Sequence, residues 1–259
     1  MIEGVRFVLW GTWRRARFVF WLCALVVVVG WFTTMSYGPS GGGVHGNEWD
    51  VLFGTLSERP IVLFWMPMFM FLTSRTFNTP WEAQAVARFR SRISWWASDI
   101  IGLAIATIVY VLATAVVALA AGSLYFGRWS WGWSALTRIG GTYAPVLHDT
   151  APLPVAVDAL ALLTLGLWML ATLHHTISFW WSSEWVSLAL LIVVIWLPLM
   201  FPAVHGVVSW TPGTQFVLGE HIAKSALAGF AWTIAYGVIL ACAGAWLGGI
   251  RALVVNWTT

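Results

Sequence analysis

Six long apolar runs alternate with polar or glycine-rich segments along the chain. An apolar helix of about 20 residues is long enough to cross a lipid bilayer. The pattern therefore predicts an all-α, polytopic membrane protein with six transmembrane helices. The expected spans are approximately 18–36, 60–74, 95–122, 152–172, 185–200 and 225–250.

The second apolar run, 60–74, is short for a regular span. As an α-helix, its roughly 15 residues would cover about 22 Å, whereas the hydrocarbon core is about 30 Å thick. We therefore expect this span to borrow residues from 49–56, to lie broken, or to be shielded by its neighbours. Pro67 in its middle favours a kink, because proline removes a backbone donor and its ring clashes with the preceding turn.

The clearest polar helix lies between the second and third runs, at 79–93. Thr79 can cap this helix, Pro80 fits its first position, and Glu82 completes a capping box three residues after the cap. The broad apolar face comprises Trp81, Ala85, Val86, Phe89 and Ile93, and the arginines at its margins are Arg88, Arg90 and Arg92. Such a helix lies along a surface, with its arginines available to lipid phosphates or to another protein.

Composition supports a membrane protein. The 259 residues are 60% hydrophobic and only 9% charged, whereas a soluble globular chain is about one quarter charged. We expect one transmembrane domain, 1–259, in the cell membrane. Cys23 and Cys242 lie in apolar runs without a CxxC motif, so neither a disulfide framework nor a zinc site is indicated.

The basic residues predict the orientation of the chain. With six spans and both termini in the cytoplasm, the cytoplasmic basic residues would be Arg6, Arg14, Arg15, Arg17, Arg75, Arg88, Arg90, Arg92 and Arg251. The external ones would be Arg59, Arg128, Arg138 and Lys224. This bias agrees with the positive-inside rule, which also explains the net charge of +3 without invoking nucleic acid. We expect 1–17 to be an amphipathic interfacial helix and 201–224 to be an external loop or re-entrant segment.

Three further segments carry expectations about local structure. The aromatic connection 123–151 is typical of an interfacial loop or short helix. A turn is expected at 174–184, after the fourth span. Asp99, near the start of the third span, can be stabilised by the helix dipole and nearby arginines.

This layout resembles that of the small six-span permease subunits of bacterial ABC exporters. The features that carry the resemblance are the basic amphipathic start, the short kinked second span, and the polar helix whose arginine segment leads into Trp95 and Trp96. The resemblance implies that 79–93 is a cytoplasmic coupling helix, which docks on a separate ATPase subunit. It also implies two such ATPase subunits and a second permease subunit, the same or different, in addition to membrane lipid.

The same resemblance suggests which residues act. The implied ATPase interface consists of Trp81, Glu82, Ala85, Val86, Arg88, Phe89, Arg90 and Arg92. Pro67, Asp158 and Pro198 are candidates for the translocation path. The chain has no GxxxxGK[ST] motif, so ATP and Mg would be held by the partner ATPase and this chain would not itself be an enzyme.

Other interpretations stay open. His174 and His175 could serve an intramembrane redox or haem subunit, although adjacent histidines on a helix point about 100° apart and are then a polar interfacial pair. Asp158 could pair with an external loop residue, and the arginines of 79–93 could contact lipid headgroups only. A membrane assembly or immunity protein without transport activity is the third hypothesis.

Overall fold

The computed structural model describes residues 21–22, 24–30, 46–57, 60–73, 92–127, 129–133, 138–139, 142–143, 151–180, 231, 234–235 and 237–246. This part of the chain is helical, apart from a short antiparallel ladder between β1 (Arg138–Ile139) and β2 (Thr142–Tyr143). Arg138 pairs with Tyr143 in that ladder, within the aromatic connection 123–151 that was expected to be an interfacial loop or short helix.

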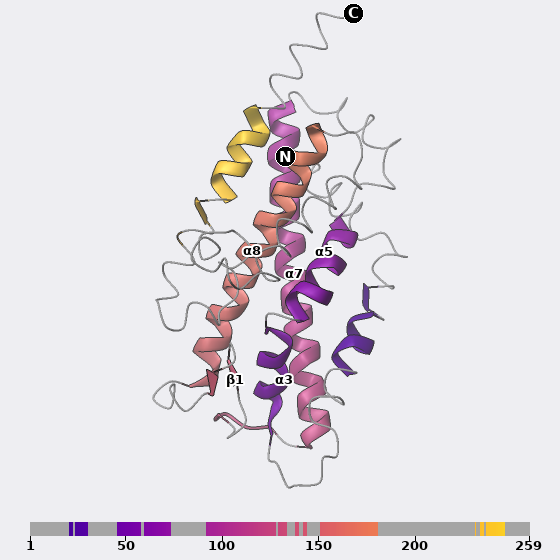
Figure 1. Ribbon diagram of the computed structural model, residues 1–259, viewed down its shortest axis with the longest axis vertical. Coiled ribbons are helices and arrows are strands. Elements are labelled where there is room, and N and C mark those ends of the chain that lie inside the picture. The colour runs from indigo at the N-terminus through magenta and orange to yellow at the C-terminus, as the bar shows by residue number, and fades with distance from the viewer. Residues whose placement is uncertain are drawn as a thin grey trace, which may run out of the picture.

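Two long antiparallel helices form the frame of the described structure (Figure 1). They are α7 (Arg92–Phe126) and α8 (Pro152–Trp180). Both contain segments long and apolar enough to cross a membrane, Ile93–Phe126 and Pro152–Ile177. These segments match the expected third and fourth spans, and they support a helical membrane protein. Of the other four runs, 185–200 lies outside the described residues and 18–36, 60–74 and 225–250 lie partly outside them, so the six-span layout stays an expectation.

The short second run was expected to borrow residues from 49–56, to lie broken, or to be shielded by its neighbours, and the structure shows this part of the chain as two helical pieces, 48–55 and 61–73. α3 (Glu48–Thr55) packs beside the C-terminal half of α7, and a turn leads from it to the π-helix η1 (Ile61–Trp65). η1 continues directly into α5 (Met66–Thr73). Together these pieces follow α7 from its C-terminal end to its N-terminal end (Figure 1).

Pro67 gives a physical reason for the π-helical turn. In a regular α-helix its ring would clash with the carbonyl four residues earlier, and that carbonyl would lose its donor. A wider turn immediately before the proline relieves this conflict, and here the Met66 amide donates to the carbonyl of Ile61, five residues back. The kink expected at Pro67 is thus accompanied by a π-helical turn upstream of it.

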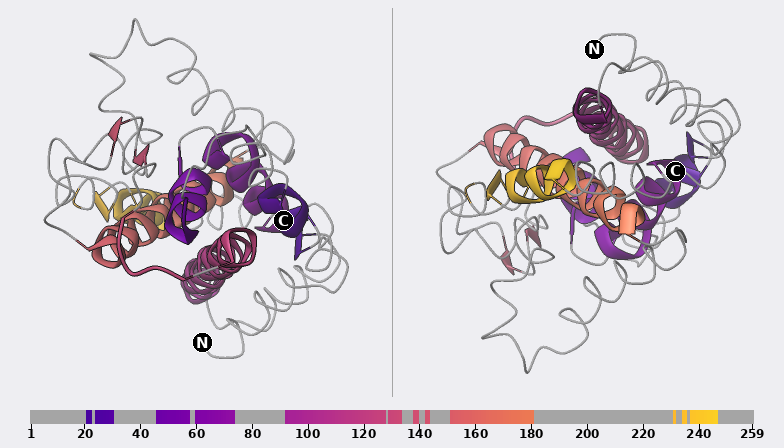
Figure 2. Two further views of the ribbon diagram at one scale, coloured as in Figure 1. Left: turned by 90° about the horizontal axis from the view of Figure 1, so that it is seen from below. Right: turned by 90° about the horizontal axis from the view of Figure 1, so that it is seen from above.

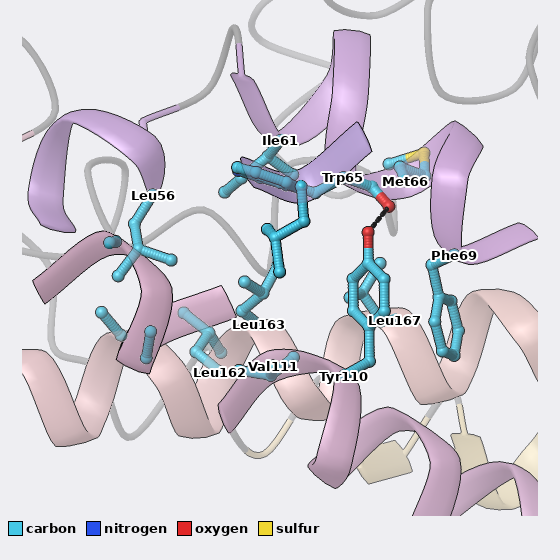
Figure 3. Close-up of a cluster of buried hydrophobic side chains, with 14 of the residues drawn as sticks. Leu56, Ile61, Trp65, Met66, Phe69, Tyr110, Val111, Leu162, Leu163 and Leu167 are labelled. Carbon is cyan, nitrogen blue, oxygen red and sulfur yellow. Dashed lines mark hydrogen bonds between the residues drawn. The ribbon is translucent and has the colours of Figure 1, made fainter. Parts of the chain in front are cut away.

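Tyr110 of α7 lies at the centre of the buried apolar core, facing η1 and α5 (Figure 3). Its ring packs against Phe69 and Trp21, with centroid distances of 5.1 Å to each. Its hydroxyl donates to the backbone oxygen of Trp65 at 2.8 Å, where η1 ends. The Trp65 indole in turn donates to the backbone oxygen of Thr55, the last residue of α3. These contacts join α3 and η1 to α7.

The apolar helix Gly237–Trp246, yellow in Figures 1 and 2, lies along α8. Two glycines allow this close packing. A Cβ atom on Gly237 would lie 2.7 Å from the Trp168 ring of α8, and one on Gly244 would overlap the Trp96 ring of α7. Trp96 also donates its indole proton to the backbone oxygen of Ala241.

Candidate functional site

Buried polar groups meet where α5 ends, α7 begins and α8 ends. We call this set, Thr73, Asp99, His174 and His175, the Asp99–His175 cluster. All four residues are at least 95% buried. His175 Nδ1 lies 2.8 Å from Asp99 Oδ2, and His175 Nε2 lies 3.3 Å from the backbone oxygen of Thr73. One imidazole from α8 therefore bridges α7 and α5.

Two tryptophans fix the helices around this cluster. Trp168 of α8 donates its indole proton to the backbone oxygen of Ile100 on α7. Trp96 connects the first turns of α7 to the helix Gly237–Trp246. Asp99 lies between these two contacts along α7, so its carboxylate is held at the place where three helices meet.

The polar groups nearest to the cluster are mostly satisfied within their own helices. Thr172 and Thr176 donate their hydroxyl protons to the carbonyls of Trp168 and Thr172, one turn earlier. Ser98 does the same with Ser94. His174 contacts the neighbouring ring of His175 edge-on, with a centroid distance of 5.8 Å. His175 thus reaches from α8 to both neighbouring elements, α7 and α5.

The structure corrects the expectation for the end of the fourth span. A turn was expected at 174–184, with His174 and His175 as an interfacial pair, but α8 continues to Trp180 and both histidines are buried. The segment from 167 to 180 contains no glycine or proline that would stop a helix. The contacts of His175 with Asp99 and Thr73 give the extension a buried anchor.

The partner of Asp99 was not found by sequence reasoning. The helix dipole and nearby arginines were expected to stabilise its carboxylate, whereas the structure places His175 beside it. A signal was present in the topology, because the start of one span and the end of the next lie on the same side of a membrane. An acid and a histidine at those two positions are therefore candidates for a pair.

The predicted site residues are not brought together in the described part of the chain. Residues 79–91 lie outside it, so Trp81, Glu82, Ala85, Val86, Arg88, Phe89 and Arg90 are not placed. Arg92 is the first residue of α7. Of the three path candidates, Pro67 on α5 and Asp158 on α8 have exposed side chains, and Pro198 lies outside the described residues.

The described residues contain no group of three or more histidine, cysteine or acidic side chains that could hold a metal ion. Both ring nitrogens of His175 already face protein oxygens. The geometry of this histidine is therefore that of a polar bridge between helices.

A second buried polar group lies at the opposite end of α7, where α3 begins. Asn47 and Asp50 form a reciprocal capping box, and the Asn47 side chain also donates to the backbone oxygen of Gly132. Glu48 Oε1 accepts a hydrogen bond from the Ser130 amide, whereas its buried Oε2 has no hydrogen-bond partner. Trp49 donates to the backbone oxygen of Ser130. The start of α3 thus holds the loop that follows α7.

Comparison with known proteins gives one match. A family model described as "Protein of unknown function (DUF2705)" matches residues 42–205, which include α3, η1, α5, α7, α8 and the whole Asp99–His175 cluster. No curated protein and no solved structure matches the chain. Because the matched segment covers more than half of the 259 residues, the chain belongs to the DUF2705 family, whose function is unknown.

Proposed function

We propose that this chain is the permease subunit of an ATP-driven ABC exporter, forms half of the translocation path, and couples to a separate ATPase subunit. The observation that carries the proposal is the start of α7. This helix begins at Arg92, at the end of the arginine-rich segment, and continues without a break for 35 residues. The sequence layout, with its capped polar helix next to a span, supports the same function.

A continuous helix is suited to transmitting a displacement. At 1.5 Å per residue, α7 is about 50 Å long, which exceeds the thickness of a bilayer core. Bending such a helix sharply requires a proline, a glycine pair or an inserted group, and the segment 93–121 has none of the first two. A movement of 79–91 therefore reaches the membrane interior as a rigid movement of α7.

The first turns of α7 would pass that movement on. Trp96 is hydrogen-bonded to Ala241, Ile100 to Trp168, and Asp99 to His175. These contacts connect α7 to α8 and to the helix Gly237–Trp246 close to the arginine-rich segment. The broken second span, with its π-helical turn and Pro67, is the more compliant element beside this rigid group.

The proposed docking contacts follow from residue chemistry. Trp81, Val86 and Phe89 supply the apolar anchors, because aromatic residues contribute much of the energy of such interfaces. Arg88, Arg90 and Arg92 orient the helix against acidic groups of the ATPase. Two ATPase subunits and a second permease subunit complete the proposed exporter.

The test is co-purification of the ATPase with permease variants in detergent. We expect Phe89→Asp to abolish co-purification, because it places a charge in an apolar contact, while the permease still inserts in the membrane. Leu124→Asp is the matched control, since Leu124 is 83% exposed at the opposite end of α7. This control should retain the ATPase.

Replacing Arg88 and Arg92 together by alanine tests the polar part of the contact. We expect reduced co-purification and a loss of substrate-stimulated ATP hydrolysis, because orienting charges are removed. If the Phe89 variant and the arginine variant both keep the ATPase and couple normally, 79–93 is a lipid anchor, and the proposed coupling role is wrong.

A further inference from the structure

The number of hydrogen bonds that His175 can make depends on how many protons its ring and the Asp99 carboxyl group hold. Its Nδ1 faces the Asp99 carboxyl group and its Nε2 faces the backbone oxygen of Thr73. A carbonyl oxygen has only lone pairs, so the Thr73 contact is a hydrogen bond only when Nε2 carries a proton. The Asp99 contact needs a second proton, on Nδ1 or on the carboxyl oxygen.

The imidazole and the carboxyl group must therefore hold two protons for both contacts to be made. With one proton fewer, a single contact survives. The carboxylate is the stronger acceptor, because hydrogen bonds to ionised groups are about twice as strong as neutral ones. The remaining proton then lies on Nδ1, facing Asp99, and the Nε2 lone pair faces the lone pairs of the Thr73 oxygen.

We propose that the Asp99–His175 cluster is a proton-binding site that controls the C-terminal end of α5. When the proton is bound, His175 holds the Thr73 carbonyl and ties α5 to α8. When the proton leaves, that bond is replaced by a repulsion between lone pairs and the end of α5 is released. The ligand is a proton alone, and the inference does not depend on the proposed exporter function.

The surroundings of the cluster were considered element by element. From α5, Thr73 contributes its carbonyl, and its hydroxyl donates to the carbonyl of Phe69. From α7, Asp99 is the ionisable group, and from α8 His174 contacts His175. The helix Gly237–Trp246 contributes Cys242, whose side chain is exposed. Within the described residues, His174 is therefore the group whose charge would most directly oppose proton binding at His175.

α5 adjoins a π-helical turn at which the chain can bend when the His175–Thr73 hydrogen bond is lost. Its N-terminal end is held by the Tyr110 hydroxyl on the Trp65 carbonyl, and the π-helical turn η1 comes immediately before it. A wide turn next to a proline is a place where a helix bends. Loss of the Thr73 bond removes one tie at the C-terminal end of α5, and we expect the local motion of that end to increase.

The experiment measures side-chain mobility on α5 as a function of pH. Phe71 is 43% exposed on α5, and Val116 is 65% exposed on α7. Each is replaced by a spin-labelled cysteine in full-length protein whose Cys23 and Cys242 are changed to serine, reconstituted in lipid nanodiscs. We expect the mobility of the label at Phe71 to rise as the pH is raised and the proton leaves the cluster, and the mobility of the label at Val116 to stay unchanged.

Two variants separate the cluster from other titrating groups. His175→Gln keeps an amide donor for Thr73 but cannot ionise, so it should abolish the pH dependence at Phe71. Asp158→Asn removes an exposed acid near the other end of α8, and should keep the pH dependence. A label at Phe71 that does not respond to pH in the native background, or one that still responds in His175→Gln, overturns the proposal.

A second measurement decides the matter if His175→Gln does not fold. Nitrogen-15 NMR of histidine-labelled protein reports whether each ring nitrogen carries a proton. The chain has six histidines, so the five others, His45, His148, His174, His205 and His221, are replaced together by glutamine, and the remaining signals are those of His175. Loss of the Nε2 proton together with the change at Phe71 supports the proposal. An Nε2 atom that stays protonated while the label at Phe71 changes overturns it.

Discussion

Asp99 is a residue at which the cost of burying an ionisable group can be compared by experiment with the stabilisation that its partner provides. An ionisable side chain inside a membrane-spanning helix is costly unless it has a partner. His175 supplies that partner at 2.8 Å, and both side chains are more than 90% buried. Removing one member of such a pair leaves the other buried without it, which costs more than the pair itself contributes.

We therefore predict that Asp99→Ala destabilises the protein by about 3–5 kcal/mol, the range for a broken buried pair. The measurement is the free energy of unfolding in detergent. Asp158→Ala is the matched control, because it removes an aspartate from an exposed position on α8, and it should change stability by less than about 0.5 kcal/mol. Equal effects of the two substitutions would show that the Asp99–His175 contact does not stabilise the fold.

At this scale, sequence reasoning finds the ionisable residues but not their pairing. Asp99 and His175 are 76 positions apart. Whether they meet depends on the rotation of α7 and α8 about their axes, which the packing of Trp168 and Trp96 sets. Asp158 illustrates the converse: it is conspicuous in the sequence because it interrupts an apolar run, yet its side chain is exposed.

At the scale of elements, the contact between α3 and α7 depends on a glycine. A Cβ atom on Gly122 would lie 2.6 Å from Glu48 Cα. The clashing atom belongs to the backbone, so a rotamer change cannot relieve the overlap, and α3 would have to move away from α7. That movement would also disturb the hydrogen bond between Glu48 and the Ser130 amide.

We predict that Gly122→Ala lowers stability by about 1–3 kcal/mol through overpacking. Alanine favours a helix by about 1 kcal/mol over glycine, so a net loss would show that the clash exceeds this gain. Gly30→Ala is the control, because Gly30 lies in helical backbone with nothing within 4 Å of an added Cβ, and it should be neutral or stabilising. The midpoint of thermal unfolding measures both variants. An unchanged or raised midpoint for Gly122→Ala contradicts the close approach.

Helix positions were predictable where the apolar pattern is long, and less so at the ends. The third run predicts 95–122, and α7 extends it by a few residues on each side. The second run falls short of a bilayer and contains Pro67, so its sequence predicts a kink together with an extension, a break or shielding by neighbours, and it does not decide among these three; the structure separates 48–55 from 61–73. The end of α8 was missed, because the polar residues 174–176 resemble a turn until Asp99 and Thr73 are placed against them.

At the scale of the whole molecule, the described structure supports a helical membrane protein and leaves the six-span layout as a prediction. Composition and run length favour the first conclusion, because the chain is only 9% charged and two of its described helices are long and apolar enough to cross a bilayer. The orientation is a different matter. It rests on the distribution of arginines, which acts during insertion and does not depend on how the helices pack.

The orientation can be tested at the two ends of α7. The hydrogen bond from Asn47 to the Gly132 backbone oxygen places the segment before α3 on the same side as the loop after α7. The arginine-rich segment precedes the other end. We therefore predict that cysteines introduced at Ser40 and Gly132 react with an impermeant reagent added outside intact cells, whereas one at Ser91 reacts only after permeabilisation.

For this labelling, Cys23 and Cys242 are first replaced by serine. Gly132 is a suitable position for a new cysteine, because an added Cβ atom there would have no heavy atom within 4 Å. Each outcome has a distinct meaning. Equal sidedness of Ser91 and Gly132 means that α7 does not cross the membrane. External labelling of Ser91 with internal labelling of Gly132 means that the chain is inverted. In that case 79–93 faces away from the cytoplasm, where ATP is hydrolysed, and it cannot be the coupling helix. The proton site at Asp99 and His175 depends only on local geometry, so this outcome leaves it open to its own test.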